Sequence, residues 1–332
     1  MSSVPATDSV ALRSPVQIET QPPIKRRKRT AKSIAGRVVA RAVNPKRLWN
    51  AVKLQRNRKA HRHTYDDAQL ALYAQILPTG FLHFGYFDDV TRTPEEMSLA
   101  EVLRAQTRYT EVLMDLAGPP SDGALDVGCG MGGLSRILRD KGYSPTALTP
   151  DRLQVSHITK TLPDIPVVRC KLEKLDAAKY AGQFGTVFTA ESLQYLKLDQ
   201  ALPILSTVLK PGGRWVACDF FYSDATTDKA CHVWDEFTAQ LAAAGWRITS
   251  QRDITPHVLP TLSYIHMWAT RFGIPLMDFG FLRLRRKQPG LHHLLESLLQ
   301  DLKHIATDNI DIIDPHTFRR RKRYMLLVME RA

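Results

Sequence analysis

The sequence predicts an α/β fold in which a doubly wound, mostly parallel sheet is covered by helices on both faces. Between residues 124 and 253, short runs rich in β-branched and aromatic residues alternate with helical stretches. The runs are apolar enough to be buried on both faces, as strands of parallel sheets are. A glycine-rich turn follows the first run and leads into a helix. No internal repeat interrupts this alternation.

The elements can be placed in order from their periodicity and their breakers. Strands are expected at 124–127, 145–149, 166–170, 185–189, 214–220 and 246–253. Helices are expected at 132–141, 151–161, 199–209 and 230–244. Two helices, at 65–77 and 98–117, precede the sheet, and a final strand is expected at 324–330 after a proline-divided helical detour. The predicted organisation is an arm at 1–63 and a domain at 64–332, the latter divided into a helical cap (64–118), a core (119–254), an insertion (255–317) and the last strand (318–332).

The charge is concentrated in the N-terminal arm. The chain has 332 residues and a net charge of +13. Residues 1–63 hold 16 Lys/Arg and 2 Asp/Glu, hence +14, so the remaining residues sum to −1. This excludes a globally basic nucleic-acid-binding domain.

The arm itself is expected to be disordered at 1–24 and amphipathic over 33–43, where Ile34 and Val38 share a face opposite Arg37 and Arg41. A second short stretch of this kind follows near Trp49. Three hypotheses remain open for the function of the arm: contact with an anionic membrane surface, loose packing on its own domain, and nucleic-acid binding or nuclear import.

Cysteine usage and hydropathy indicate a reducing, cytoplasmic setting. Four cysteines lie far apart with no Cys-x-x-Cys pair, so neither a metal site nor a disulfide framework is expected. No apolar run approaches the length of a membrane span, and no secretory signal is expected at the N-terminus.

The turn at 128–133 reads Gly-Cys-Gly-Met-Gly-Gly between a strand and a helix. Its glycines allow a tight bend and let a ligand lie against bare backbone, while the helix start offers N–H groups to an anion. A dinucleotide pyrophosphate and the methionine end of S-adenosylmethionine both fit this arrangement. The helical prelude, the carboxylate of Asp126 and the Leu209–Gly213 turn before a strand favour S-adenosylmethionine.

Three segments resemble class I S-adenosylmethionine-dependent methyltransferases. Leu125-Asp126-Val127-Gly128-Cys129-Gly130-Met131-Gly132 is similar to their first motif, Ala190–Tyr195 to the segment after the fourth strand, and Leu209–Gly213 to the turn before the fifth. His83-Phe84-Gly85-Tyr86 resembles a segment of the small-molecule and lipid branch, which includes cyclopropane-fatty-acid synthases and tocopherol and sterol methyltransferases. The resemblance implies a Rossmann-like, seven-stranded sheet whose last strand is antiparallel.

The resemblance and the pattern together nominate the site residues. The candidates for cofactor binding are Tyr86, Gln106, Asp126, Gly128, Cys129, Gly130, Gly132, Thr149, Asp151, Gln154, Leu172, Glu173 and Glu191. The candidates for proton transfer are His83, Glu191 and Tyr195. The sequence departs from the family where the second strand ends, since Thr149 stands there and Asp151 is the nearest acid for a ribose. Lys171 and Glu173 occupy the two candidate positions for the adenine contact.

The function expected is S-adenosylmethionine-dependent methyl transfer to a small, apolar or lipid-like acceptor that is reached at a membrane surface, with no metal. Two alternatives stay open: a nucleic-acid methyltransferase that uses the basic arm, and a non-catalytic protein that retains the fold.

Overall fold

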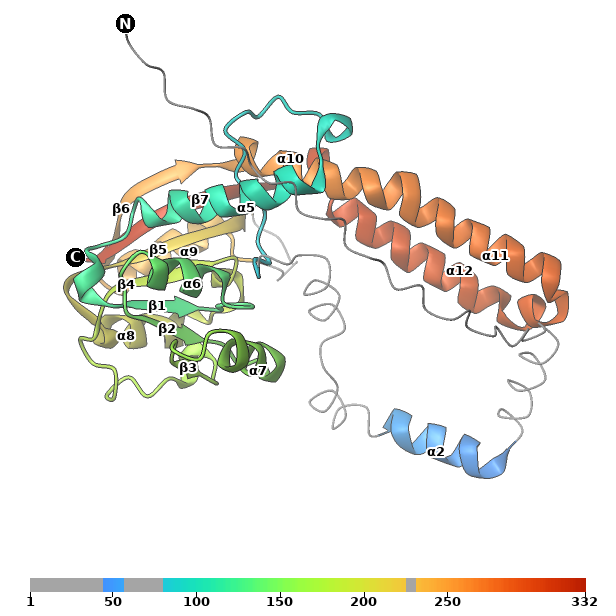
Figure 1. Cartoon of the computed structure of the whole chain (residues 1–332), viewed down its shortest axis with the longest axis horizontal. Coiled ribbons are helices and arrows are strands. Elements are labelled where there is room, and N and C mark those ends of the chain that lie inside the picture. Colours follow the sequence, from blue (N-terminus) through green and yellow to red (C-terminus); the bar gives the residue numbers. More distant parts are fainter. Residues whose placement is uncertain (1–43, 57–79, 225–230) are drawn as a thin grey trace, which may run out of the picture. The chain divides into compact units, whose positions relative to one another are not determined.

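The computed structural model describes residues 44–56, 80–224 and 231–332 (Figure 1). The expected disordered segment 1–24, the amphipathic segment 33–43, the helix at 65–77 and the arm–domain boundary at 63 lie outside these residues. Two units are distinguished, 1–49 and 50–332. Helix α2 (Pro45–Arg56) spans their boundary and carries Trp49, which is 67% exposed.

The sheet has seven strands in the order β3-β2-β1-β4-β5-β7-β6. They are β1 (Ala124–Val127), β2 (Pro145–Leu148), β3 (Val167–Val168), β4 (Phe184–Ala190), β5 (Leu209–Tyr222), β6 (Trp246–Asp253) and β7 (Lys322–Arg331). β1 to β5 are parallel, and β7 is antiparallel to both β5 and β6. The fold expected from the sequence is therefore confirmed.

Helices cover both faces of the sheet, as a doubly wound fold requires. One core cluster joins strand residues to α8 (Leu198–Val208) and α9 (Trp234–Ala243). The other joins them to α5 (Leu99–Met114), α6 (Gly133–Asp140) and α10 (Thr255–Trp268). α7 (Arg152–Thr161) closes a smaller cluster beside β2.

The side chains of β1 alternate between these two layers. Leu125 and Val127 enter the first cluster and Ala124 the second, because successive strand residues point to opposite faces. This alternation places Asp126 on the α6 side of the sheet, where Ser135 of α6 contacts it.

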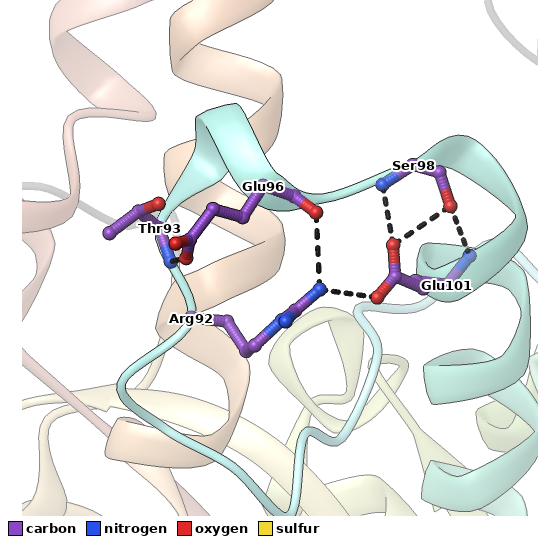
Figure 2. Close-up of polar contacts among 5 residues, drawn as sticks. All are labelled: Arg92, Thr93, Glu96, Ser98 and Glu101. Carbon is purple, nitrogen blue, oxygen red and sulfur yellow. Dashed lines mark hydrogen bonds and ion pairs between the residues drawn. The ribbon is translucent and has the colours of Figure 1, made fainter.

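A capping network of hydrogen bonds stabilises the N-terminus of α5 (Figure 2). Ser98 Oγ accepts from the Glu101 N–H, while the Ser98 N–H donates to Glu101 Oε2 at 2.8 Å. Arg92 binds the same carboxylate and also donates to the Glu96 carbonyl at 3.1 Å. The loop before α5 is therefore tied to the helix that covers the sheet.

A helical detour separates β6 from β7. After α10, a π-helical turn (Ala269–Gly273) leads into α11 (Ile274–Lys287), which lies beside α12 (Pro289–Ile312) (Figure 1). α13 (Pro315–Arg321) follows. β7 begins at Lys322, two residues before the strand expected from 324, directly after α13, whose start is capped by Asp314 through the Thr317 N–H.

Candidate functional site

The glycine turn links β1 to α6 at the carboxyl end of the sheet. Gly128, Gly130 and Gly132 have φ values of +73°, +55° and +85°, a region that L side chains enter only with strain. A Cβ added at Gly128 would lie 2.3 Å from Ser192 Cβ. The loop after β4 thus lies directly against the turn, and glycine is required there by both conformation and space.

A buried carboxyl group, that of Asp126, lies on β1 just before this loop. Asp126 is 2% exposed and accepts a hydrogen bond of 2.6 Å from Ser135 Oγ. Burial raises the pKa of Asp126 to about 6, with the serine hydrogen bond opposing that rise. Burial also raises the pKa of the Cys129 thiol well above its usual range, so this thiol is neutral and packs beside α7.

An extended segment, 80–87, lies across the turn. The ring of Phe81 abuts Gly133, and Leu82 abuts Gly130, where an added Cβ would meet Leu82 Cδ1 at 3.3 Å. Further along, the Gly85 N–H donates to Thr261 Oγ1 of α10 at 3.0 Å. The aromatic segment singled out in the sequence therefore covers the glycine turn and connects it to α10.

Glu191 is the polar centre of this arrangement. It follows β4 with a φ of +53°, and among the described residues it is the non-glycine residue with a left-handed backbone. Its Oε1 accepts hydrogen bonds from the Phe84 N–H at 2.7 Å and from the Tyr324 hydroxyl at 2.6 Å. Backbone strain of this kind persists only where the surroundings enforce it, and it is frequent at functional sites.

Burial raises the pKa of Glu191 to about 7, and the hydrogen bonds from Tyr324 and Phe84 oppose the rise. Asp219 of β5 is fully buried. Burial, and in part the charge of nearby Glu191, raises the pKa of Asp219 to about 8. The site therefore holds two carboxyl groups that change protonation close to neutral pH.

A chain of hydroxyl groups continues from Glu191 into the core. The Tyr324 hydroxyl lies 3.1 Å from the Tyr109 hydroxyl, which donates to the Cys218 carbonyl at 3.2 Å. Sequence reasoning did not find Tyr324, Tyr109 or Asp219, because each lies in a segment whose pattern signals only a buried strand or helix. Their role depends on β7 pairing beside β5, which no local pattern reveals.

His83 and Gln106 lie next to this network. Gln106 Nε2 donates to the His83 carbonyl at 2.7 Å, and His83 Nδ1 contacts the Phe84 carbonyl at 2.8 Å. The imidazole stacks on Tyr109 with ring centroids 4.1 Å apart, and burial lowers the pKa of His83 to about 4. Within the described part of the chain, His83 Nε2 and Gln106 Oε1 are buried without a hydrogen-bond partner. Such atoms are normally satisfied by a ligand or a water.

Tyr86 packs further from the turn. Its ring stacks on His257 of α10 with centroids 4.3 Å apart and an interplanar angle of 7°. Its N–H donates to the Ala105 carbonyl at 2.8 Å. Tyr86 therefore joins the cap to α5 and α10.

The candidates at the end of β2 form a compact cluster. Thr149 Oγ1 donates to Gln154 Oε1 at 2.5 Å and accepts from the Asp151 N–H at 3.1 Å. Asp151 caps α7 by accepting from the Gln154 N–H at 2.9 Å. Asp151 remains partly exposed at the carboxyl end of the sheet, as the expected ribose contact requires.

Three candidates are not brought to the Glu191 network. The Tyr195 ring is 73% exposed, Leu172 is buried in the core cluster beneath α8, and Glu173 Oε1 accepts from the Lys197 N–H at 2.9 Å. Leu172 and Glu173 were nominated from the loop after the third strand, for the adenine contact, and Tyr195 from the segment after the fourth strand. Short 3₁₀ turns at Leu172–Lys174 and Leu193–Tyr195 carry the three side chains. Of the three candidates for proton transfer, Glu191 contacts the segment that carries His83, whereas Tyr195 is exposed.

A hollow of about 170 Å³ lies away from the glycine turn, beside Phe318 and Lys322. The described residues contain no cluster of His, Cys, Asp and Glu that could hold a metal. None of their helices is long and apolar enough to cross a membrane.

Comparison with known proteins finds similarity to methyltransferases. Residues 124–213, from β1 to the start of β5, match the model of a methyltransferase domain. Over 112 residues the chain is 38% identical to 2-methyl-6-phytyl-1,4-hydroquinone methyltransferase of Synechocystis sp. (strain ATCC 27184 / PCC 6803 / Kazusa), covering 32% of this chain and 34% of that enzyme. Over 200 residues it is 26% identical to an O-methyltransferase of Pyrenophora dematioidea, covering 54% of this chain and 73% of that enzyme. The chain thus spans about a third of the length of the first of these relatives.

Among solved structures, geranyl diphosphate C-methyltransferase from Streptomyces coelicolor A3(2) has the same fold. The TM-score is 0.57 at 17% identity, over 83% of this chain and 97% of that one. That structure was determined with S-adenosyl-L-homocysteine, Mg²⁺ and geranyl diphosphate. The chain described here carries a methyltransferase domain with the class I fold, and the resemblance stated from its motifs is confirmed.

Proposed function

We propose that the chain transfers a methyl group from S-adenosylmethionine to a small, prenyl- or lipid-like acceptor. The observation that carries the proposal is the placement of Glu191, a strained and desolvated carboxyl group held beside the glycine turn by the segment that covers that turn. The match of residues 124–213 to a methyltransferase domain supports the reaction class. The phytyl hydroquinone and geranyl diphosphate in the names of similar proteins support the acceptor class.

The residues present fit the cofactor. The glycine turn and the start of α6 suit its methionine end, and Asp151 suits the ribose hydroxyls. The partnerless polar atoms His83 Nε2 and Gln106 Oε1 lie in the cap that covers the turn, as a polar ligand beneath that cap would require. When bound, S-adenosylmethionine supplies an activated methyl group on a sulfonium, so the protein mainly aligns the partners and excludes water.

Glu191 is the group that would take the acceptor's proton. With a pKa of about 7, its carboxyl group is partly ionised at neutral pH, which suits general base catalysis. Oε1 already accepts two hydrogen bonds, so the proton would be received on Oε2. Tyr324 and the Phe84 N–H keep the carboxylate oriented, whereas burial lowers the pKa of His83 to about 4, which makes it a weaker proton acceptor than Glu191.

The test is methyl incorporation from labelled S-adenosylmethionine into 2-methyl-6-phytyl-1,4-hydroquinone and geranyl diphosphate. Glu191→Gln should retain cofactor binding and lose roughly 100-fold or more in kcat, the usual contribution of a general base. Glu236→Gln, an exposed carboxyl on α9, is the matched control and should leave kcat unchanged. Absence of incorporation into either compound by the parent protein would reject this acceptor class, and equal activity of the two variants would reject the role of Glu191.

A further inference from the structure

The hairpin formed by α11 and α12 has no buried residue in either helix, although both are rich in large apolar side chains. The end of α10, the π-helical turn and α11 bear a row of exposed apolar groups: Ile265 (42%), Trp268 (45%), Phe272 (54%), Leu276 (70%), Phe279 (56%) and Leu282 (63%). Within α11, Leu276, Phe279 and Leu282 are spaced by three, so they share one face. Across the π-helical turn, Trp268 stacks on Phe272 with ring centroids 4.3 Å apart, which joins the exposed groups of α10 to those that follow. We call this face the outer stripe.

The outer stripe faces away from α12. The half-buried apolar residues of α11 are Ile274, Met277, Phe281 and Leu284, which are again spaced by three or four, on the opposite side of the helix. The ion pair between Asp278 and Lys303 joins the two helices at 2.8 Å. α11 is therefore apolar on two sides, and a helix with this pattern is normally covered on both.

The stripe is large for an uncovered surface. Given its exposures and the roughly 200–280 Å² of a fully exposed Leu, Phe or Trp, it presents roughly 700 Å², above the few hundred Å² usual for a monomer. An apolar face of this size indicates contact with a partner or a lipid surface.

The charges on the hairpin distinguish between a protein partner and a lipid surface. Arg283 and Arg286 continue the spacing of Phe279 and Leu282, so cations extend the same face, and Arg285 and Lys287 lie beside them. Residues 274–287 hold four basic residues and one acidic residue, Asp278, whose charge is paired with Lys303. The exposed outer side of α11 is thus apolar and cationic.

α12 has the opposite charge. Residues 289–312 contain four acidic residues and one basic residue, Lys303. An anionic surface would attract the α11 side of the hairpin and repel the α12 side, which defines one orientation. Aromatic and leucine side chains with arginines at one end are the groups that enter the headgroup region, since arginine stems bury while their charges stay hydrated.

We propose that the outer stripe of α10 and α11, with Arg283 and Arg286, docks on an anionic lipid bilayer. α10 also holds the cap of the site, through Thr261 to Gly85 and through His257 to the Phe87 carbonyl at 2.8 Å. This consequence rests on the proposed function: if the acceptor is lipid-like, docking places α10, which contacts the cap of the site, next to the bilayer in which the acceptor is dissolved. The docking itself does not depend on methyltransferase activity.

Vesicle binding of the full chain tests the proposal, with phosphatidylcholine alone compared with a 7:3 mixture with phosphatidylglycerol. Arg283→Glu/Arg286→Glu should weaken partitioning into the anionic vesicles about 30-fold or more, from the contribution of each cation near a charged surface. Arg319→Glu/Arg320→Glu, with the same charge change on exposed residues of α13, should have a much smaller effect. Leu276→Gln/Phe279→Gln should weaken binding more than Leu294→Gln/Leu298→Gln, whose side chains are similarly exposed but lie on α12.

Residues 1–63 carry a net charge of +14, so the arm is a second candidate for attracting anionic lipid, and a readout local to the hairpin is needed. Trp268 and Trp49 are both well exposed. Quenching by brominated phosphatidylglycerol should disappear in Trp268→Phe and persist in Trp49→Phe. Quenching lost only in Trp49→Phe would assign lipid binding to the arm and overturn the proposal. A change from dimer to monomer in Leu276→Gln/Phe279→Gln with unchanged vesicle binding would also overturn it, since the stripe would then join two copies of the chain.

Discussion

Replacing Tyr324 by phenylalanine tests the electrostatic account of the site. The change removes the hydroxyl that donates to Glu191 Oε1 at 2.6 Å, while the Tyr109 hydroxyl keeps its bond to the Cys218 carbonyl. A hydrogen bond to a charged group contributes about 1.5–3 kcal/mol and one between neutral groups about 1 kcal/mol. Since the pKa of Glu191 is about 7, the lost bond is charge-assisted at pH 8.5 and neutral at pH 5.5.

The variant should therefore lose about 2 kcal/mol of unfolding free energy at pH 8.5 and about 1 kcal/mol at pH 5.5. The pKa of Glu191 should rise by roughly one unit, because one unit corresponds to 1.36 kcal/mol of differential interaction. Urea unfolding at the two pH values measures the difference. Tyr143→Phe is the matched control: its hydroxyl donates to the neutral Gly118 carbonyl at 2.7 Å, so its loss should not depend on pH. Equal losses for Tyr324→Phe at both pH values would refute the reasoning.

Further expectations concern the turn and the second buried carboxyl. Gly128→Ala should lower the free energy of unfolding by about 2–4 kcal/mol and abolish cofactor binding, because strain at φ +73° adds to overpacking against Ser192. Gly142 has a φ of +87° but open space around it, so Gly142→Ala should lower the free energy of unfolding by only about 1 kcal/mol, measured by thermal unfolding. Similar losses in the two variants would show that Ser192 does not constrain the turn. Asp219 binds a proton more tightly in the folded state, so stability should fall as the pH rises from 6.5 to 8, by up to 1.36 kcal/mol per unit for one group. Asp219→Asn should flatten this slope in urea titrations and leave the part due to the other shifted groups, Glu191 chief among them; an unchanged slope would contradict the assignment.

The sheet was predictable because its signals are local. The alternation of apolar strands with helices and the glycines at 128–132 specify a parallel sheet with a ligand turn at its carboxyl end. Strand limits were less predictable: β3 pairs only through Val167 and Val168, although the apolar run there is longer. β3 is an edge strand of the sheet, and Pro166 and Arg169 flank its two valines.

The polar network was only partly predictable. Glu191 and His83 were nominated from motifs, yet their neighbours Tyr324 and Asp219 come from β7 and β5, which meet only through antiparallel pairing. Tyr195 lies four residues from Glu191, but it leaves the site because a 3₁₀ turn follows β4. Long-range pairing and single-turn geometry are not encoded in the periodicity of any one segment.

The most direct test of the account is titration calorimetry of the full chain with S-adenosylmethionine. The account predicts saturable heat with one site per chain and a rise in melting temperature with ligand concentration. Neither heat nor a thermal shift, in a sample whose circular dichroism shows the folded α/β domain, would contradict it.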